Sequence, residues 1–268
     1  MTEELAGGRL RLDHPAEAVA RLTITRPAAR NALDHDLLNA LTEAMPSLDR
    51  GIEVRCVLIT GEGTAFSAGY DIAGIAEASF EQDAEALIAH PFHAALSAVA
   101  AHPWPVLAAI NGQALGGGLE LALACDLRIA AAGAKLGMPP AKLGLVYGHT
   151  GLQRFIDAIG VPRTKELFLT GRNVPAERAE RIGLVNWVVD DDRLEGAAIE
   201  LGAEIASNAP LSLKGNKHAI EVLNSHPRLS EEQERELIEL RRSCFASEDL
   251  REGIRAFAEK RSPEWRGR

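Results

Sequence analysis

Three consecutive glycines, Gly116 to Gly118, stand between an apolar segment and a short apolar helix. The segment Pro105–Asn111 predicts a buried strand, and Gly118–Cys125 predicts a helix. Glycines at this junction leave the first N–H groups of the helix unpaired, and the helix dipole adds partial positive charge there. Such a turn can stabilise an oxyanion. Taken alone, it more often serves only close packing of a strand against a helix.

A second turn of small residues, Ala65–Ile72, follows the predicted strand Val54–Thr60. Small residues there leave the backbone open to a ligand. Neither turn has the GxGxxG pattern or the Lys-Ser/Thr pair of a phosphate-binding loop. Two such turns in this order favour a ligand site over packing alone.

Strands and helices alternate through the first part of the chain, which predicts an α/β fold. Further predicted strands are two within Arg9–Thr25 and one at Asp126–Ala132, and further helices are Leu33–Leu48 and Glu81–Ala101. From Thr150 onward the pattern is mostly helical, with helices expected at Pro162–Leu169, Pro175–Ile182, Leu194–Ser207, Pro210–Leu223 and Ser230–Phe245. We therefore expect an α/β body over residues 1–200 and a helical part over residues 201–268.

Composition excludes several function classes. The net charge of -9 argues against nucleic-acid binding, which needs a basic surface. The three cysteines lie far apart and no His/Cys cluster has metal-ligand spacing, so we expect free thiols in a reducing compartment and no metal. The N-terminus has no signal-peptide pattern, and the apolar stretch Val106–Cys125 is interrupted by polar residues and glycines. These features predict a cytoplasmic protein without a membrane span.

Several motifs together resemble the crotonase superfamily, the enoyl-CoA hydratase/isomerase family. They run along nearly the whole chain: Leu22–Pro27, Asn31–Leu33, Phe66–Ile72, Asn111–Glu120, Ala124–Asp126, Thr170-Gly171, Ala179–Val185, Ala256-Phe257 and Glu259–Arg261. The resemblance implies a spiral of ββα units, a helical C-terminal part used for assembly into a trimer or a dimer of trimers, and a coenzyme A thioester as substrate. It implies no separate cofactor, since coenzyme A enters as part of the substrate.

The resemblance also implies roles for individual residues. The N–H groups of Ala68 and Gly117 match the oxyanion hole, and Glu120 matches a catalytic glutamate. The loop Arg26–Leu33 matches the segment that lies along coenzyme A, and Lys260 matches a basic position near its phosphates. The substrate-binding residues expected on this basis are Arg26, Ala28, Arg30, Ala68, Gly69, Tyr70, Asp71, Ile72, Gly116, Gly117, Pro139, Pro140 and Lys260.

The expected reaction depends on position 140. Hydratases of the family resemble one another in having a second glutamate after the position of Pro139, but here that residue is Pro140, which cannot transfer a proton. The motifs around Tyr147 and in the C-terminal segment look most like the methylmalonyl-CoA decarboxylase branch, which also lacks that glutamate and has a tyrosine matching Tyr147. That branch has a histidine where this chain has Tyr70.

Three functions follow as alternatives. The favoured one is a lyase that decarboxylates a methylmalonyl-CoA-like thioester: loss of CO2 gives an enolate directly, the oxyanion hole stabilises it, and Tyr147 and Tyr70 can hold the leaving carboxylate. The second is a hydratase or isomerase that uses Glu120 alone, helped by Tyr147 or His149. The third is a family member that binds acyl-CoA without turnover.

Non-catalytic interpretations apply to the same residues. Glu120 could be an acid favoured by the helix dipole, and Tyr147 a packing aromatic. Asp71 is typical of a short acid that bonds nearby backbone N–H groups after a glycine turn. His149 could be an ordinary loop residue, and Lys260 a solvated surface charge.

Overall fold

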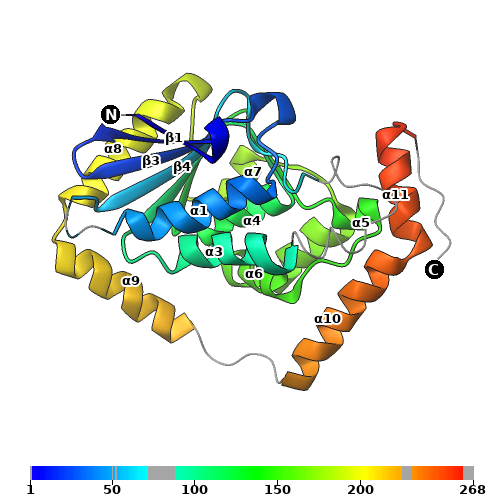
Figure 1. Cartoon of the computed structure of the whole chain (residues 1–268). Helices are drawn as coiled ribbons and strands as arrows, with labels where there is room; N and C mark the ends of the chain where they lie inside the picture. Colours follow the sequence, from blue (N-terminus) through cyan, green and yellow to red (C-terminus); the bar gives the residue numbers. More distant parts are fainter. Residues whose placement is uncertain (1, 50, 52, 72–87, 225–230, 262–268) are drawn as a thin grey trace.

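In the computed structural model, the described residues are 2–49, 51, 53–71, 88–224 and 231–261. Two sheets and a layer of helices form the body of the molecule (Figure 1). The larger sheet has the strand order β1-β2-β3-β4-β6-β8-β11 and the smaller one β10-β9-β7-β5. The larger sheet is antiparallel from β1 to β3 and parallel from β3 to β11.

The strands of the larger sheet are short and apolar. They are β1 (Glu3–Leu5), β2 (Leu10–Ala16), β3 (Val19–Ile24), β4 (Cys56–Gly61), β6 (Val106–Ile110), β8 (Leu127–Ala131) and β11 (Trp187–Val189). All five residues of β6 are buried, as expected for a central parallel strand that is covered on both faces. Its register is fixed by the pairs Val57 with Val106 and Leu107 with Leu127.

The smaller sheet consists of strands of two or three residues: β5 (Ala65–Ser67), β7 (Gln113–Leu115), β9 (Lys135–Gly137) and β10 (Val174–Pro175). Each of β4, β6 and β8 in the larger sheet is followed by β5, β7 or β9 in the smaller one. The chain therefore repeats a two-strand unit three times and moves sideways by one strand each time. This is the expected spiral of ββα units.

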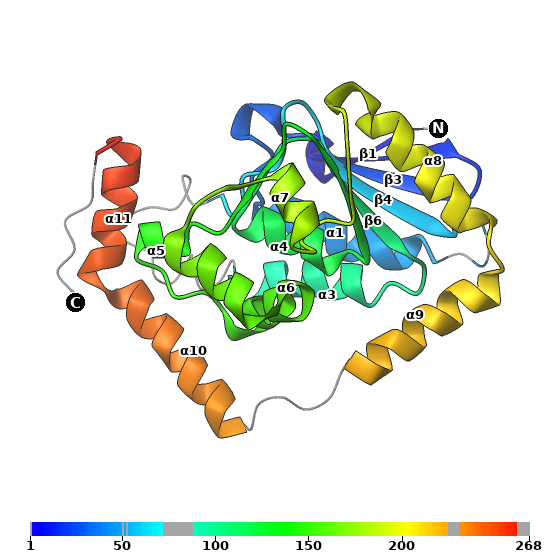
Figure 2. The ribbon, with the colours of Figure 1, turned by 180° about the vertical axis from the view of Figure 1, so that it is seen from behind.

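Helices cover the sheets and continue to the end of the described chain. They are α1 (His35–Ser47), α3 (His93–Ala100), α4 (Gly117–Ala124), α5 (Pro140–Leu143), α6 (His149–Thr170), α7 (Ala176–Arg181), α8 (Leu194–Ser207), α9 (Pro210–Asn224), α10 (Glu231–Ala246) and α11 (Glu248–Ala258). Among the described residues, short turns of other helix types lie at Ala6–Gly8, Pro27–Ala29, Ile88–Phe92 and Asp191–Arg193. The view from behind shows α8 across one face of the larger sheet (Figure 2).

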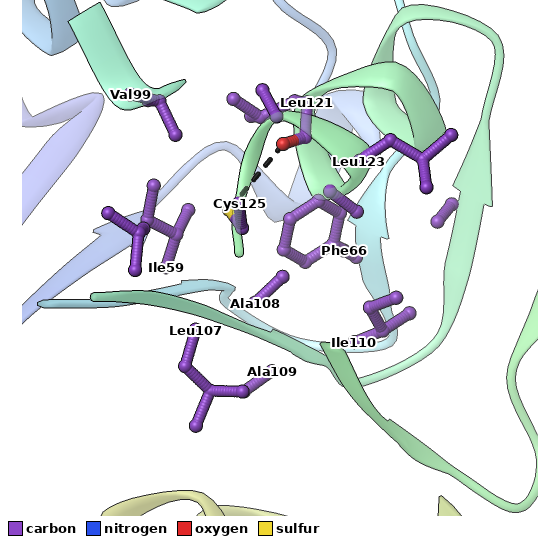
Figure 3. Close-up of a cluster of buried hydrophobic side chains, with 14 of the residues drawn as sticks. Ile59, Phe66, Val99, Leu107, Ala108, Ala109, Ile110, Leu121, Leu123 and Cys125 are labelled. Carbon is purple, nitrogen blue, oxygen red and sulfur yellow. Dashed lines mark hydrogen bonds between the residues drawn. The ribbon is translucent and has the colours of Figure 1, made fainter. Parts of the chain in front are cut away.

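The buried core lies between the larger sheet and α4. Phe66 sits among side chains of β4, β6 and α4, and the thiol of Cys125 donates to the Leu121 carbonyl at 3.5 Å (Figure 3). Burial raises the pKa of Cys125 and of Cys56 to about 12, so both free thiols stay protonated. The side chain of the third cysteine, Cys244, lies outside the described residues.

The predicted elements of the body are confirmed, with several corrections. The strands of the smaller sheet, β1 and β11 were not predicted, because two- or three-residue strands carry almost no periodicity. The helix expected at Pro162–Leu169 is the second half of α6, which begins at His149 and bends at Gly160. Most of the helix expected at Glu81–Ala101 is outside the described residues, and α3 is its last part. The helix α11 was also not expected.

Two of the three described C-terminal helices extend from the body, and the third packs against it. Helices α9 and α10 extend away from it in both views, while α11 returns to pack beside α5 (Figures 1 and 2). The expected boundary at residue 200 falls inside α8, which packs on the larger sheet. The division into two parts stays a prediction. No described helix combines the length and the apolar character that crossing a bilayer would require.

Candidate active site

The site lies where the three short parallel strands of the smaller sheet end. The turn after β5 carries Ala68 to Asp71, the turn after β7 leads into α4 at Gly117, and the turn after β9 carries Pro139 and Pro140. Because β5, β7 and β9 are parallel neighbours, their carboxyl ends meet at one edge of the sheet. The two glycine turns are therefore brought together by the strands that precede them.

The first two of these turns approach each other closely at Gly69 and Gly117. Gly69 has a φ of +95°, and a Cβ there would lie 2.8 Å from the Leu115 carbonyl oxygen and 3.1 Å from the Gly117 nitrogen. Only glycine meets both the backbone angle and the spacing. A Cβ on Gly117 would lie 2.9 Å from the Tyr70 ring, which packs over that turn. Gly116, with a φ of +52°, completes the turn.

The two expected oxyanion donors differ in whether their N–H group already has a hydrogen-bond acceptor. The Gly117 N–H is at the first position of α4, where N–H groups have no acceptor inside the helix. The Ala68 N–H instead donates to the Arg30 carbonyl at 2.9 Å. A ligand oxygen reaches the Ala68 N–H only if the Arg30 carbonyl moves away.

Glu120 and the two tyrosines form a hydrogen-bonded row. The Tyr147 hydroxyl donates to Oε2 of Glu120 at 2.6 Å, and the hydroxyl oxygens of Tyr70 and Tyr147 lie 3.4 Å apart. Since the single proton of Tyr147 is directed at Glu120, Tyr70 is the donor of the second bond. These are the only two tyrosines of the chain.

Burial controls the ionisation of this row. Glu120 is 3% exposed, and its burial raises the pKa of the carboxyl group to about 7, against the opposing effects of the Tyr147 hydrogen bond and of Arg154. The Nε atom of Arg154 lies 3.9 Å from Oε1 of Glu120. Burial and the nearby Glu120 charge both raise the pKa of Tyr147 well above its usual value. Near neutral pH, Glu120 is poised to exchange a proton, and Tyr147 remains a neutral donor.

A cavity of about 840 Å³ opens beside Tyr70, at one end of this row. Six of the expected binding residues line it, namely Ala28, Arg30, Ala68, Tyr70, Asp71 and Pro139. Its other walls come from α5, from the end of α6 and the residues after it, and from α11 and the residues after it, including Lys142, Thr170, Asn173, Phe257 and Arg261. Phe257 is 66% exposed, an unusual state for a large aromatic side chain. The cavity combines a basic rim with an apolar wall.

Gly69, Gly116 and Gly117 form the two turns described above, and the other expected binding residues do not line the cavity. Arg26 is not on the cavity wall: its guanidinium pairs with Asp71 at 2.8 Å and with Asp34 at 3.2 Å. These bonds hold the loop Arg26–Leu33 against the β5 turn. Lys260 is exposed and not on the cavity wall, and Pro140 is buried at the start of α5. Ile72 lies outside the described residues.

Sequence reasoning did not find two residues that contact Glu120. Arg154 and Gly151 both lie on α6, in a segment for which no helix was predicted. A basic residue and a glycine in a loop carry no signal by themselves, and only the fold brings them to α4. His149, the expected alternative acid, lies at the start of α6 and is partly exposed. No group of three metal-binding side chains occurs among the residues that the structure describes.

Comparison with known proteins agrees with this architecture. The chain matches the family described as Enoyl-CoA hydratase/isomerase over residues 14–268. It is 40% identical over 253 residues to the probable enoyl-CoA hydratase echA8 of Mycobacterium bovis, covering 93% of this chain and 95% of that protein. It is 35% identical over 260 residues to the 2,3-dehydroadipyl-CoA hydratase of Escherichia coli, with coverage of 94% and 96%.

Solved structures of a decarboxylase and of hydratases resemble this chain. One is methylmalonyl-CoA decarboxylase in complex with 2-nitronate-propionyl-CoA, with a TM-score of 0.88, 28% identity and coverage of 97% of this chain and 99% of that one. Another is an enoyl-CoA hydratase from Bacillus anthracis, with a TM-score of 0.73, 35% identity and coverage of 97% and 100%. By its sequence match and by the spiral of ββα units, the chain belongs to the enoyl-CoA hydratase/isomerase family of the crotonase superfamily.

Proposed function

We propose that this acyl-CoA enzyme decarboxylates a malonyl-type thioester such as methylmalonyl-CoA. The observation that carries the proposal is the row Tyr70–Tyr147–Glu120, in a chain that has a proline at position 140. Hydration through two carboxylates needs a second acid at that position, and proline has none. Decarboxylation needs no base to remove a carbon proton, because the C–C bond to the carboxylate supplies the electron pair.

The proposed reaction uses the site in three steps. The thioester oxygen binds the Gly117 N–H and, after the Arg30 carbonyl moves aside, the Ala68 N–H. The C–C bond to the carboxylate breaks, CO2 leaves, and the electron pair delocalises onto the thioester oxygen as an enolate, which the two N–H groups stabilise. A proton from the Glu120–Tyr147 pair then adds to the carbon, and the product is a saturated acyl-CoA.

In this proposal Tyr70 supplies the contact to the leaving carboxylate by turning its hydroxyl proton from Tyr147 to the carboxylate, while Tyr147 continues to donate to Glu120. Tyr70 lines the cavity and its hydroxyl is within 3.4 Å of that of Tyr147. Hydrogen bonds from neutral hydroxyls hold a carboxylate less tightly than a cation does, so the carboxylate is easily released as CO2. The likeness to methylmalonyl-CoA decarboxylase supports this assignment.

A second candidate is hydration or isomerisation of an enoyl-CoA. The names of the relatives at 35% to 40% identity favour it, and so does the pKa of about 7 of Glu120, which suits a single acid/base that returns its proton. In that case Glu120 alone handles both water and proton.

A product assay separates the candidates. Purified protein is incubated separately with methylmalonyl-CoA and crotonyl-CoA, and the acyl-CoA products are identified by mass. We expect methylmalonyl-CoA to give propionyl-CoA, and Tyr147→Phe to lower kcat by roughly 100-fold. Hydration of crotonyl-CoA without decarboxylation would overturn the proposal in favour of the second candidate. Binding of both thioesters without turnover of either would indicate a non-catalytic family member.

A further inference from the structure

The first two turns of α6 place two residues that the proposed reaction does not use near the carboxylate of Glu120. They are Gly151 and Arg154, which are three positions apart and so share one face of the helix. Gly151 lies against both carboxylate oxygens of Glu120 and the Tyr147 ring, and Arg154 lies on the side of Oε1.

Position 151 needs a glycine because there is no space for a side chain, and not because the backbone angle demands it. It lies in the helical part of α6, where any residue fits the backbone and alanine favours the helix more than glycine does. A Cβ at this position, however, would lie 2.5 Å from Cε1 of Tyr147 and 2.9 Å from each carboxylate oxygen of Glu120. All three contacts are too short for real atoms, so an alanine here must push Glu120, Tyr147 or both from their present positions.

Arg154 adds charge at the same place. Its Nε lies 3.9 Å from Oε1 of Glu120, while Oε2 accepts the Tyr147 hydroxyl. The arginine side chain is 26% exposed and the glutamate side chain only 4%. At this separation and burial, the guanidinium favours the charged form of the carboxyl group without forming a tight hydrogen bond that would fix it there.

We propose that Gly151 and Arg154 are positioning residues for the Glu120–Tyr147 pair, Gly151 by leaving the space that both groups occupy and Arg154 by placing a positive charge beside Oε1. The proposal rests on the proposed function only in taking this pair as the proton-transfer group. The helix α6 thereby connects the proton affinity of the pair to the packing of a single helical turn.

The charge of Glu120 also depends on the other charged and titratable groups near α4. In the part of the chain that the structure describes, Tyr147 and Arg154 act on Glu120 directly, and Tyr70 acts through Tyr147. The elements α3 and β8, which pack against α4, carry the titratable or charged residues His93 and Arg128. Arg128 binds the Cys125 and Leu184 carbonyls, at the opposite end of α4 from the catalytic turn.

The two tyrosines provide a test that needs no substrate. Because Tyr70 and Tyr147 are the only tyrosines, protein labelled with ¹³C at tyrosine Cζ gives two resonances, both from this site. We expect the Tyr147 resonance to show an inflection near pH 7, where Glu120 ionises, and the inflection to vanish in Glu120→Gln. The second observation assigns the inflection to Glu120.

The variants then measure positioning. In Arg154→Met we expect the inflection to move up by about one pH unit, and in Arg154→Lys by less than half as much. In Gly151→Ala we expect the inflection to be lost or displaced, and kcat to fall roughly 100-fold with KM changed by less than about threefold. The matched control is Gly196→Ala, at the third position of α8 just as Gly151 is at the third position of α6. A Cβ at Gly196 meets no atom within 4 Å, so both readouts should stay at their wild-type values.

Each result decides the question. An unmoved inflection in Arg154→Met, or a wild-type inflection and kcat in Gly151→Ala, overturns the role of that residue. If Gly151→Ala does not fold, the two Arg154 variants decide alone. If no acyl-CoA is turned over, the proposed function fails, while the tyrosine titration still shows whether α6 sets the ionisation of Glu120.

Discussion

At the scale of single residues, the carboxyl group of Glu120 is buried in surroundings that disfavour its charged form. Its carboxyl group is buried and accepts a hydrogen bond from the Tyr147 hydroxyl, and the Nε atom of Arg154 lies 3.9 Å from its Oε1 atom. The pKa of about 7 compares with an ordinary value of 4.5. The folded protein therefore holds a proton on Glu120 at pH values where the unfolded chain has lost it.

This difference predicts how stability depends on pH. A carboxyl pKa that is raised on folding stabilises the protein fully below pH 4.5, and the benefit is lost as pH rises through about 7. Glu120→Gln cannot lose a proton, so its free energy of unfolding relative to wild type should rise between pH 4.5 and pH 8 by on the order of 3 kcal/mol. Urea denaturation at a series of pH values measures it. If the free energy of unfolding changes with pH by the same amount in both proteins, the raised pKa of Glu120 is contradicted.

At the scale of elements, the site depends on how closely two turns approach. The turns after β5 and β7 meet at Gly69 and Gly117, and the Tyr70 ring covers the contact. Their separation is set by main-chain pairing of very short strands and not by large side chains. A single methyl group at the contact should therefore be enough to open the oxyanion hole.

We predict that Gly69→Ala lowers kcat at least tenfold. Its φ of +95° costs about 1 to 2 kcal/mol in any L-residue, and the added Cβ would also displace the Leu115 carbonyl and the Gly117 N–H. Gly51→Ala is the control, because Gly51 has a φ of +70° but a Cβ there meets nothing within 4 Å. Kinetics and thermal unfolding of both variants separate the two effects. Equal kcat values would show that the turns need not be this close.

At the scale of the whole molecule, two lysines of α9 bind the body among the side chains that the structure describes. The Nζ atom of Lys217 lies 2.7 Å from Asp126 and 3.2 Å from the Trp104 carbonyl oxygen, and the lysine side chain is only 10% exposed. Lys214 lies 2.8 Å from Asp49 and 4.3 Å from the centre of the Trp104 ring, but its side chain is 34% exposed. The more buried of the two pairs should contribute more to stability.

We expect Lys217→Met to lower the free energy of unfolding by about 2 kcal/mol, because it leaves part-buried oxygens without their charged donor. Lys214→Met should cost less than about 1 kcal/mol, since solvent screens its exposed contacts. Chemical denaturation at low and high salt measures both. Equal losses for the two variants would mean that burial does not control how α9 is attached. The assembly into trimers stays a prediction, which sedimentation of the wild-type protein can test.

Much of the fold could be predicted from the sequence. Apolar runs such as Val54–Thr60 and Pro105–Asn111 are long enough to show a buried strand, and the glycine turns mark where strands end. The strands β5, β7 and β9 could not be predicted, because three residues give no period and their pairing is decided by the spiral. The start of α6 was also missed, since Gly148 and Gly151 there are typical of a loop.

The sequence by itself determined the chemistry that is present: two glycine turns, one glutamate early in a helix, a proline at position 140 and only two tyrosines. The tertiary structure alone decided which of these groups meet. It joined Tyr147 to Glu120 across 27 positions, placed Gly151 and Arg154 against the same carboxylate, and directed Arg26 toward Asp71 instead of the cavity. The physical reason is that hydrogen bonds and pKa values depend on distance and burial. Residues far apart in the sequence acquire both only when the chain folds.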